Sequence, residues 1–419
     1  MEKKEVAIIG GGAIGLCAAY YLIKCGRQVT IIDQNPAADE TSCSFGNAGL
    51  IVPSHLVPLA APGVITKGLQ WMLDAESPFY IKPRLNLELI SWLWEFYKAS
   101  SHDRVMQAAP ILRDLNVGSK ALLSEMSNDE HFYFEVEEKG LLILCKTQKY
   151  LNKEGKNAEM ANQLGVRAEV LNVEQVNALL PSFEPAACGG VYYPDDAHII
   201  PGDFMQELRK WLTSHGAEFI SNLSVEALEG RNGKIEQLIA KGKKIGVSQV
   251  VLTSGAWTSL LLRSVGIKLP LQAGKGYNLT LPNPPKTVDL PLLLGESKVA
   301  VTPMGDSLRF AGTMEIAGID LNINPKRIAG IKKAIKKYLP AFDDSWVSDV
   351  SPWAGLRPCT PDGLPYIGRS TAFNNLTVAT GHAMLGLSLS PITGKLVSEI
   401  ISEEKPSIDL SLLHPERFN

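Results

Sequence analysis

The feature that most constrains the fold of this chain is its first segment, residues 6–33, with the sequence VAIIGGGAIGLCAAYYLIKCGRQVTIID. Residues 6–9 form a short apolar run typical of a buried strand. Glycines follow in a G-x-G-x-x-G pattern that opens a helix through about Lys24. A second apolar run, residues 29–32, ends on Asp33. This order predicts a strand–helix–strand unit with a glycine turn.

Each glycine has a separate task in such a turn. Gly10 allows the tight turn, Gly12 lets the backbone approach a pyrophosphate, and Gly15 lets the helix pack closely on the strand. The helix N-terminus attracts phosphate, and Asp33 is placed to accept hydrogen bonds from a ribose. The segment therefore predicts dinucleotide binding. The alternative is an ordinary glycine-rich turn with nothing bound.

Composition sets broad limits. At 419 residues the chain is too long for one simple core, so we expect two domains or one large elaborated domain. A net charge of −3 gives no reason to expect nucleic acid as a partner. The six cysteines include no C-x-x-C pair, which argues against a zinc site or a disulfide framework and suits a reducing compartment. We predict no metal site.

The sequence also bears on membranes. The first apolar run lies within a few residues of Met1 and is followed by glycines, so we expect no signal peptide. No apolar stretch approaches 18 uninterrupted residues, so we expect no spanning helix. Residues 87–97, LELISWLWEFY, predict an amphipathic helix with three large aromatic residues. A core helix is the favoured interpretation, since Glu88 and Glu95 occupy its polar positions; contact with a membrane surface is the alternative.

Two loops follow Asp33. SFGNAG, residues 44–49, combines small residues with an amide and a hydroxyl, which suits close passage beside a flat ligand; a plain loop is the alternative. Residues 51–64 hold three prolines and His55, so we expect an extended, stiff segment.

The middle of the chain predicts helices over 105–127 and 150–180, with a strand at 141–146 between them. A helix over 201–216 and strands up to residue 257 indicate that an interrupted nucleotide domain resumes there. Ser254 and Gly255 would then lie at the carboxyl end of a parallel strand, the usual ligand edge. Residues 270–320 alternate with period two and predict an antiparallel sheet, closed by a lysine-rich helix.

The last hundred residues carry a second signature. WAGLRPCTPDGLPYIGR, residues 353–369, precedes a strand, the loop GHAMLG and a helix beginning near Ser388. The N-terminus of that helix favours an anionic or electron-rich partner.

Together these segments resemble the small-subunit type of D-amino-acid dehydrogenase within the glycine-oxidase-like, FAD-dependent amine oxidoreductases. The resemblance covers nearly the whole chain. It rests on GGGAIG with Asp33, SFGNAG, APGV, KGYNLTLP, RFAGTMEIAG, WAGLRPCTPDGLPYIGR and GHAMLG. Two departures border the implied flavin pocket, where they affect substrate identity: the loop before Asn47 is longer, and GHAMLG stands where GHGTLG is familiar.

The resemblance implies a non-covalently held FAD that accepts hydride at flavin N5. The expected fold class is α/β plus α+β: an interrupted Rossmann-like FAD-binding domain (residues 1–55, 199–265 and 351–419) and an antiparallel-sheet substrate domain (56–198 and 266–350). The predicted cofactor residues are Gly10, Gly12, Ala13, Ile14, Gly15, Asp33, Gln34, Ser42, Ser44, Asn47, Ala48, Gly49, Val225, Ser254, Gly255, Trp257, Gly381, His382, Met384, Leu385 and Gly386.

For catalysis the resemblance implies that Arg357, in GLRP, pairs with a substrate carboxylate. The alternative is a structural arginine paired with Asp362 or a backbone carbonyl. Tyr277 is a second candidate for that carboxylate, or a packed tyrosine. His55 and His382 are candidates for taking the proton from the substrate ammonium; otherwise bulk water takes it.

The expected reaction is oxidation of the Cα–N bond of a D-amino acid, or of a cyclic secondary amine of the D-proline or hydroxy-D-proline type. The product is an imine or a 2-oxo acid, and electrons pass to a quinone or another carrier. A glycine- or sarcosine-type oxidase using O₂ and a non-catalytic FAD electron relay are the alternatives. We expect a cytoplasmic protein, with peripheral contact at the inner face of the cell membrane left open.

Overall fold

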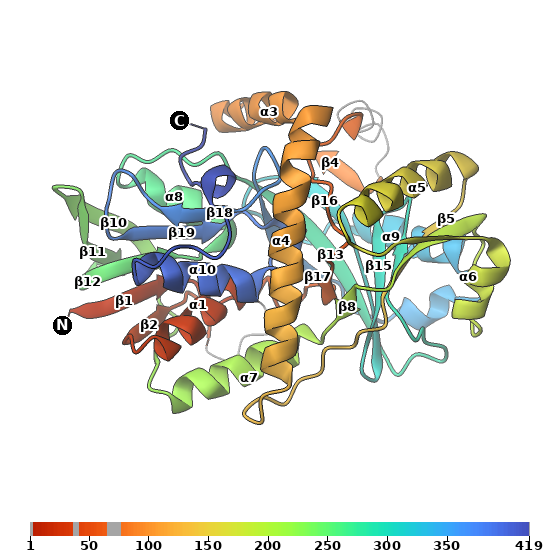
Figure 1. Cartoon of the computed structure of the whole chain (residues 1–419), viewed down its shortest axis with the longest axis horizontal. Helices are drawn as coiled ribbons and strands as arrows, with labels where there is room; N and C mark the ends of the chain where they lie inside the picture. The colour runs from red at the N-terminus through yellow and green to blue at the C-terminus, as the bar shows by residue number, and fades with distance from the viewer. Residues whose placement is uncertain (1–2, 37–41, 65–76, 419) are drawn as a thin grey trace.

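Two large sheets lie side by side in the computed structural model, which describes residues 3–36, 42–64 and 77–418 (Figure 1). The first sheet has the strand order β10–β11–β12–β1–β2–β9, and β19 and β18 extend it beside β12. Its strands are β1 (Lys4–Ile9), β2 (Val29–Ile32), β9 (Glu218–Ile220), β10 (Val225–Arg231), β11 (Lys234–Ala240), β12 (Lys243–Leu252), β18 (Tyr366–Arg369) and β19 (Leu376–Thr380).

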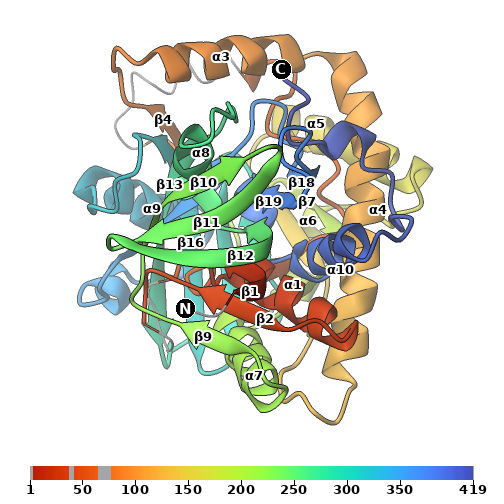
Figure 2. The ribbon, with the colours of Figure 1, turned by 90° about the vertical axis from the view of Figure 1, so that its left-hand side faces the viewer.

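The centre of the first sheet is parallel, with β1 between β2 and β12. Val6 and Ile8 face a core shared with α1 (Ala13–Lys24), α7 (Pro201–Ser214) and α10 (Ser390–Ile401). Ala7 and Ile9 face a second core containing β10, β11 and α8 (Thr258–Arg263). Burial on both faces explains the uninterrupted apolar runs of β1 and β2. Figure 2 looks onto this half of the molecule.

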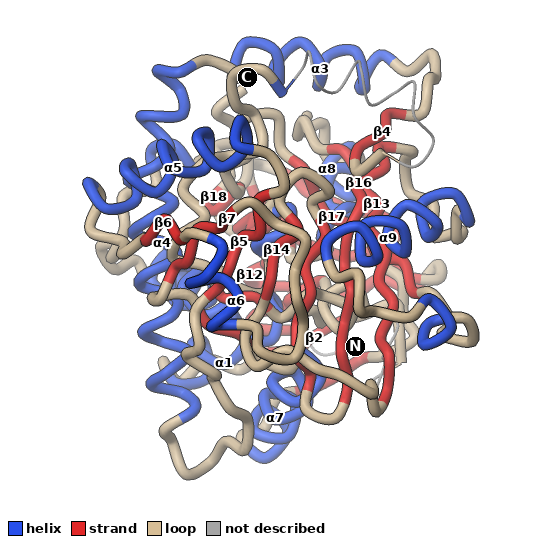
Figure 3. Tube along the Cα trace, turned by 90° about the vertical axis from the view of Figure 1, so that its right-hand side faces the viewer, coloured by secondary structure: helices blue, strands red, loops and turns tan. Residues whose placement is uncertain are grey.

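The second sheet is mostly antiparallel, in the order β17–β13–β16–β15–β14–β5–β7–β6, with β4 beside β16 (Figure 3). The helix α9 (Pro325–Tyr338) packs on Leu279 and Phe310 of this sheet. The strands are β4 (Phe79–Ile81), β5 (Leu141–Cys145), β6 (Glu169–Leu171), β7 (Gly189–Tyr193), β13 (Gln272–Pro282), β14 (Leu292–Leu294), β15 (Val299–Met304), β16 (Ser307–Ile316) and β17 (Trp353–Cys359).

Four more helices are α3 (Leu87–Ala99), α4 (His102–Ser127), α5 (Gln148–Gln163) and α6 (Val173–Leu179). The long helix α4 crosses in front of the junction between the two sheets (Figure 1). Its Asn116 accepts a hydrogen bond from Ser388, just before α10, at 3.0 Å. One helix therefore joins both halves of the molecule. No helix in the described part of the chain is long and apolar enough to cross a bilayer.

The predicted fold class is confirmed, and most predicted elements are present. The single helix expected over 150–180 is wrong. Gly165, with φ of +82°, ends α5, strand β6 follows, and an Asn172 capping box starts α6. The domain division stays a prediction, but its boundary at 351 separates β17 from β13, the strand with which β17 pairs.

A small two-stranded sheet ties the segment after SFGNAG to the second half of the chain. In it β3 (Leu50–Ile51) pairs with β8 (Ala197–His198). Beside it the carboxylate of Asp196, fully buried, accepts hydrogen bonds from the Ser54 N–H at 2.9 Å and the Ser54 hydroxyl at 2.6 Å. Burial raises the pKa of Asp196 to about 7, and the Ser54 hydrogen bonds only partly offset this.

The Asp196 carboxyl predicts a pH-dependent stability. Because its folded pKa lies above the ordinary value, its contribution is fully present below about pH 4 and is lost as the pH rises through 7. Between about pH 5 and about pH 7.5 the Tm of the protein should fall, and Asp196→Asn should flatten that fall, because the amide carries no charge. Thermal unfolding across this range measures the effect.

Asp195→Asn is the matched control. Burial raises the pKa of Asp195, but hydrogen bonds from Arg167 outweigh this and hold it below its usual range. Asp195 therefore stays ionised throughout, and because its charge is the smallest of the influences on the Asp196 pKa, this variant should stay close to the wild-type slope. If the Tm of Asp196→Asn falls with pH as steeply as that of the wild type, Asp196 is not the source of the pH dependence.

Candidate active site

The glycine turn has the predicted geometry. Gly10 adopts a φ of +112°, a conformation that side chains other than glycine rarely adopt. A Cβ on Gly15 would lie 1.9 Å from the Gly10 carbonyl oxygen, so only glycine lets α1 approach β1 this closely. The Thr253 hydroxyl, from the end of β12, donates to the same carbonyl at 2.8 Å.

Asp33 lies at the carboxyl end of β2, next to this turn. Its Oδ2 accepts from the Gly11 N–H at 2.5 Å, and its Oδ1 accepts from the Asn35 N–H at 2.8 Å. Arg209 of α7 donates to the Gly11 carbonyl at 2.8 Å. The carboxylate is thereby fixed at the edge of the sheet, where a ribose bound to this turn would meet it.

One large cavity, of about 1170 Å³, begins at the glycine turn and continues over the second sheet. It brings together Arg357, Tyr277, His55 and His382 with nearly all the predicted cofactor residues. Gly15, Gly49 and Gly381 do not line it. The role of each lining residue stays a prediction. The lining residues among those predicted for the cofactor are Gly10, Gly12, Ala13, Ile14, Asp33, Gln34, Ser42, Ser44, Asn47, Ala48, Val225, Ser254, Gly255, Trp257, His382, Met384, Leu385 and Gly386.

The SFGNAG loop is held by residues that the sequence did not single out. Arg309, buried in β16, donates to the Phe45 carbonyl at 2.9 Å and the Asn47 carbonyl at 2.6 Å. The Asn278 amide donates to the Gly46 carbonyl at 2.8 Å. Burial lowers the pKa of Arg309 to about 10. Nothing in the local sequence marks these contacts, because their partners lie more than 200 residues away.

The two predicted flavin segments meet in space. The Asn47 amide donates to the Met384 carbonyl at 3.4 Å, and the Val52 N–H donates to the Ser388 hydroxyl at 3.2 Å. Ala383, in the GHAMLG motif, adopts a φ of +46°, a conformation that favours glycine. Ala383 lines the cavity, so this departure from GHGTLG lies in the wall of the pocket.

The guanidinium of Arg357 lies directly over Gly276, where a Cβ would be 2.2 Å from Cζ. Its Nη1 donates to the Thr313 carbonyl at 2.6 Å. Within the described residues no carboxylate pairs with it, and burial lowers its pKa. Of the two structural alternatives, the backbone carbonyl is present. Asp362 instead pairs with Arg417 at 2.7 Å and 2.8 Å, so that alternative is wrong. One edge of the Arg357 guanidinium remains available to a carboxylate.

Tyr277 has a different setting from the one its predicted role requires. Its ring packs in the core beneath α9, and its hydroxyl donates to Glu315 Oε2 at 2.7 Å. This contact favours the packed-tyrosine alternative.

Both candidate histidines border the cavity as weak bases. His382 is buried, with Nε2 2.9 Å from the Thr393 hydroxyl, and burial lowers its pKa to about 3. Burial, aided by the charge of Lys298, lowers the pKa of His55 to about 4. Neither imidazole is charged at neutral pH.

The cavity also extends along the second sheet to α5, a branch that sequence reasoning missed. Glu154, buried on α5, accepts from the Asn157 amide at 2.8 Å. Lys298 donates to the Tyr150 hydroxyl at 2.6 Å. These polar groups line the cavity on the side of the second sheet.

Comparisons with known proteins agree with this geometry. A family model described as FAD dependent oxidoreductase matches residues 5–400. A D-amino acid dehydrogenase of Vibrio atlanticus (strain LGP32) is 33% identical over 418 residues, covering 97% of this chain and 99% of that one. One of Methylobacterium sp. (strain 4-46) is 31% identical over 414 residues, covering 96% of each. The chain belongs to the family of FAD-dependent oxidoreductases.

Solved structures share the fold. The glycine oxidase of Geobacillus kaustophilus superposes with a TM-score of 0.80 at 22% identity, covering 100% of both chains. The L-proline dehydrogenase of P.horikoshii gives 0.75 at 19% identity, covering 100% of this chain and 98% of that one.

FAD is the cofactor of this family, and the residues present fit it. The turn beside Gly12 offers backbone N–H groups to a pyrophosphate, and Asp33 faces the place of the adenosine ribose. The loop held by Arg309 and the Met384 segment, which contact each other, both line the cavity, so a flat ring system bound there would lie beside both.

Arg309 predicts a measurable effect on cofactor affinity. Arg309→Met removes a charged donor from two carbonyls of the loop. Because roughly 3 kcal/mol of charged hydrogen bonding is lost, FAD binding should weaken on the order of 100-fold. Titration of apoprotein with FAD measures this. Arg369→Met, which removes a donor from the Ile400 carbonyl in α10, should leave the affinity unchanged. Equal affinities in both variants would contradict the role of Arg309.

Proposed function

We propose that this enzyme oxidises the Cα–N bond of a D-amino acid, with cyclic D-proline-type amines included. The observation that carries the proposal is Arg357: a half-buried guanidinium that lines the cavity and has one backbone partner and no carboxylate among the described residues. The curated relatives named D-amino acid dehydrogenase support the substrate class. An electron-relay subunit would have no use for such a group.

In this proposal Arg357 binds the substrate carboxylate and fixes the direction of the Cα–H bond. Bound FAD supplies the hydride acceptor. The substrate gives up a hydride from Cα and becomes an iminium ion, which loses a proton to give the imine; water then converts the imine to a 2-oxo acid and ammonia. In a cyclic substrate the imine persists or the ring opens.

Arg357 variants test the proposal. With FAD bound and without oxygen, a D-amino acid in a panel should bleach the flavin absorbance. Arg357→Ala should raise KM on the order of 100-fold, because roughly 3 kcal/mol of charged hydrogen bonding is lost. Arg357→Lys keeps the positive charge but cannot make two parallel hydrogen bonds to a carboxylate. Its KM should therefore lie between those of the wild type and Arg357→Ala. Bleaching by no D-amino acid or D-proline analogue, or an unchanged KM in Arg357→Ala, would contradict the proposal.

We propose that bulk water takes the substrate proton. The pKa values of about 4 and about 3 make His55 and His382 far weaker bases than an amine. Because only the free amine expels hydride readily, kcat/KM should rise with pH toward the pKa of the substrate amine. His55→Asn should leave that rising limb in place. A limb between pH 5 and 7 that disappears in His55→Asn would instead assign the proton to His55.

We further propose that the electrons pass to a quinone or another carrier, in a cytoplasmic protein that contacts the inner face of the cell membrane. The polar and apolar walls of the cavity suit either this activity or a glycine- or sarcosine-type oxidase. Peroxide release in air-saturated buffer separates the two.

A further inference from the structure

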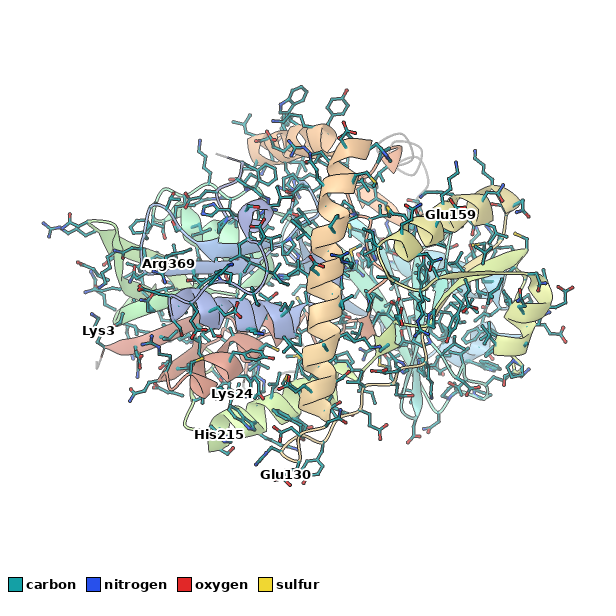
Figure 4. All side chains as sticks on the ribbon, viewed as in Figure 1. Lys3, Lys24, Glu130, Glu159, His215 and Arg369 are labelled. Atoms are coloured by element: carbon teal, nitrogen blue, oxygen red, sulfur yellow. The ribbon has the colours of Figure 1, made fainter. Side chains whose placement is uncertain are left out.

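The helix α3 has two apolar sides. Leu89, Trp92 and Phe96 are buried against the molecule. The other side, which we call the α3 ridge, consists of Leu87, Ile90, Trp94 and Tyr97, spaced to share one face. Trp94 is 59% exposed and Tyr97 is 62% exposed. Figures 1, 2 and 3 all place α3 on the outer edge of the molecule, and Figure 4 shows side chains projecting outward from it.

Other exposed apolar side chains gather around the ridge. Leu85 precedes it, and Met106 follows it on α4. Leu260 lies on α8, whose Arg263 forms an ion pair with Glu88 of α3. The exposed Leu321 lies on the loop after β16, which contacts Arg84 at Gly318. Most large exposed apolar side chains in the described part of the chain therefore lie on this edge.

The charges on this edge favour an anionic surface. Glu88 pairs with Arg263, and Glu95 pairs with Lys98, so neither acid presents an unbalanced charge. Basic side chains outnumber acidic ones here, although the whole chain has a net charge of −3. The charged residues of the edge are Lys82, Arg84, Lys98, Arg104 and Arg263 against Glu88, Glu95, Asp103 and Asp320, the last of which pairs with the buried Lys275.

The ridge is also close to the cavity. Leu59, Val64 and Phe79 line the cavity and pack in the same core as the buried side of α3. Leu260 and Leu321 are exposed and line the cavity, so it approaches the surface beside the ridge. The Trp92 indole donates to the Cys359 carbonyl at 2.9 Å, in the strand that carries Arg357.

We propose that the α3 ridge docks on the surface of a lipid bilayer that contains anionic lipid. The helix lies parallel to the membrane, with Trp94 and Tyr97 among the headgroups and the basic residues against lipid phosphates. Docking turns the cavity toward the bilayer, where a lipid-soluble quinone would be reached. That last point rests on the proposed function; the lipid contact rests on the surface alone.

Vesicle flotation tests the lipid contact. The FAD-loaded protein should float with vesicles of phosphatidylcholine and phosphatidylglycerol, and less with phosphatidylcholine alone or at high salt. The double variant Trp94→Ser/Tyr97→Ser should reduce the floated fraction roughly tenfold. Tyr133→Ser is the matched control, since Tyr133 is 81% exposed and follows Glu130, which lies at the edge opposite α3 (Figure 4). This control should float like the wild type.

Activity with a water-soluble electron acceptor should be the same in the double variant and the wild type, while the rate with a long-chain quinone embedded in the vesicles should fall. If neither the wild type nor the double variant is active with either acceptor, the proposed function is contradicted. The flotation result would still test the lipid contact on its own. A wild type that does not float, or that self-associates through the ridge instead, would overturn the docking proposal, as would equal flotation of the double variant.

Discussion

Two guanidinium groups on the second sheet, the buried one of Arg309 and the half-buried one of Arg357, need compensation for their charge, and the site is built around that need. Neither Arg309 nor Arg357 has a carboxylate partner in the described residues. A buried charge without any partner is costly. Arg309 is satisfied by carbonyls of the SFGNAG loop, which holds that loop in one conformation. Arg357 has one carbonyl partner among the described residues, so a bound anion would complete the compensation of its charge. One arginine shapes the cofactor loop and the other selects the ligand.

This arrangement makes the site depend on the whole fold. The SFGNAG loop leaves the first sheet, is held by Arg309 from the second, and contacts Met384 near the end of the chain. The Ser54–Asp196 contact and α4 add two further ties across the same junction. A cavity made in this way forms only when both sheets are in place. This explains why cofactor binding and global folding should be strongly linked in this protein.

Local physics made part of the molecule predictable. The glycine turn, β1, α1, β2 and Asp33 follow from residues within one short segment, and their expected geometry is present. Contacts between distant segments were not predictable: no pattern near Arg309 indicates that its partners are at 45 and 47. Tyr277 shows the same limit, because its alternation places it in a sheet without saying that Glu315 holds its hydroxyl. The prediction followed the helical periodicity across residues 150–180. In the structure, Gly165 adopts a positive φ and ends α5.

The aromatic helix α3 shows why two interpretations of one pattern need not exclude each other. A helix needs one apolar stripe to dock on its core, and Leu89, Trp92 and Phe96 supply it. The fold does not need the second stripe. Exposed Leu87, Ile90, Trp94 and Tyr97 gain nothing from water, and they favour aggregation unless another surface covers them. Lysine or glutamate at these positions would serve the helix equally well. The presence of large apolar side chains beside a cavity opening is therefore not explained by the folded chain alone, and the proposed bilayer contact would account for it.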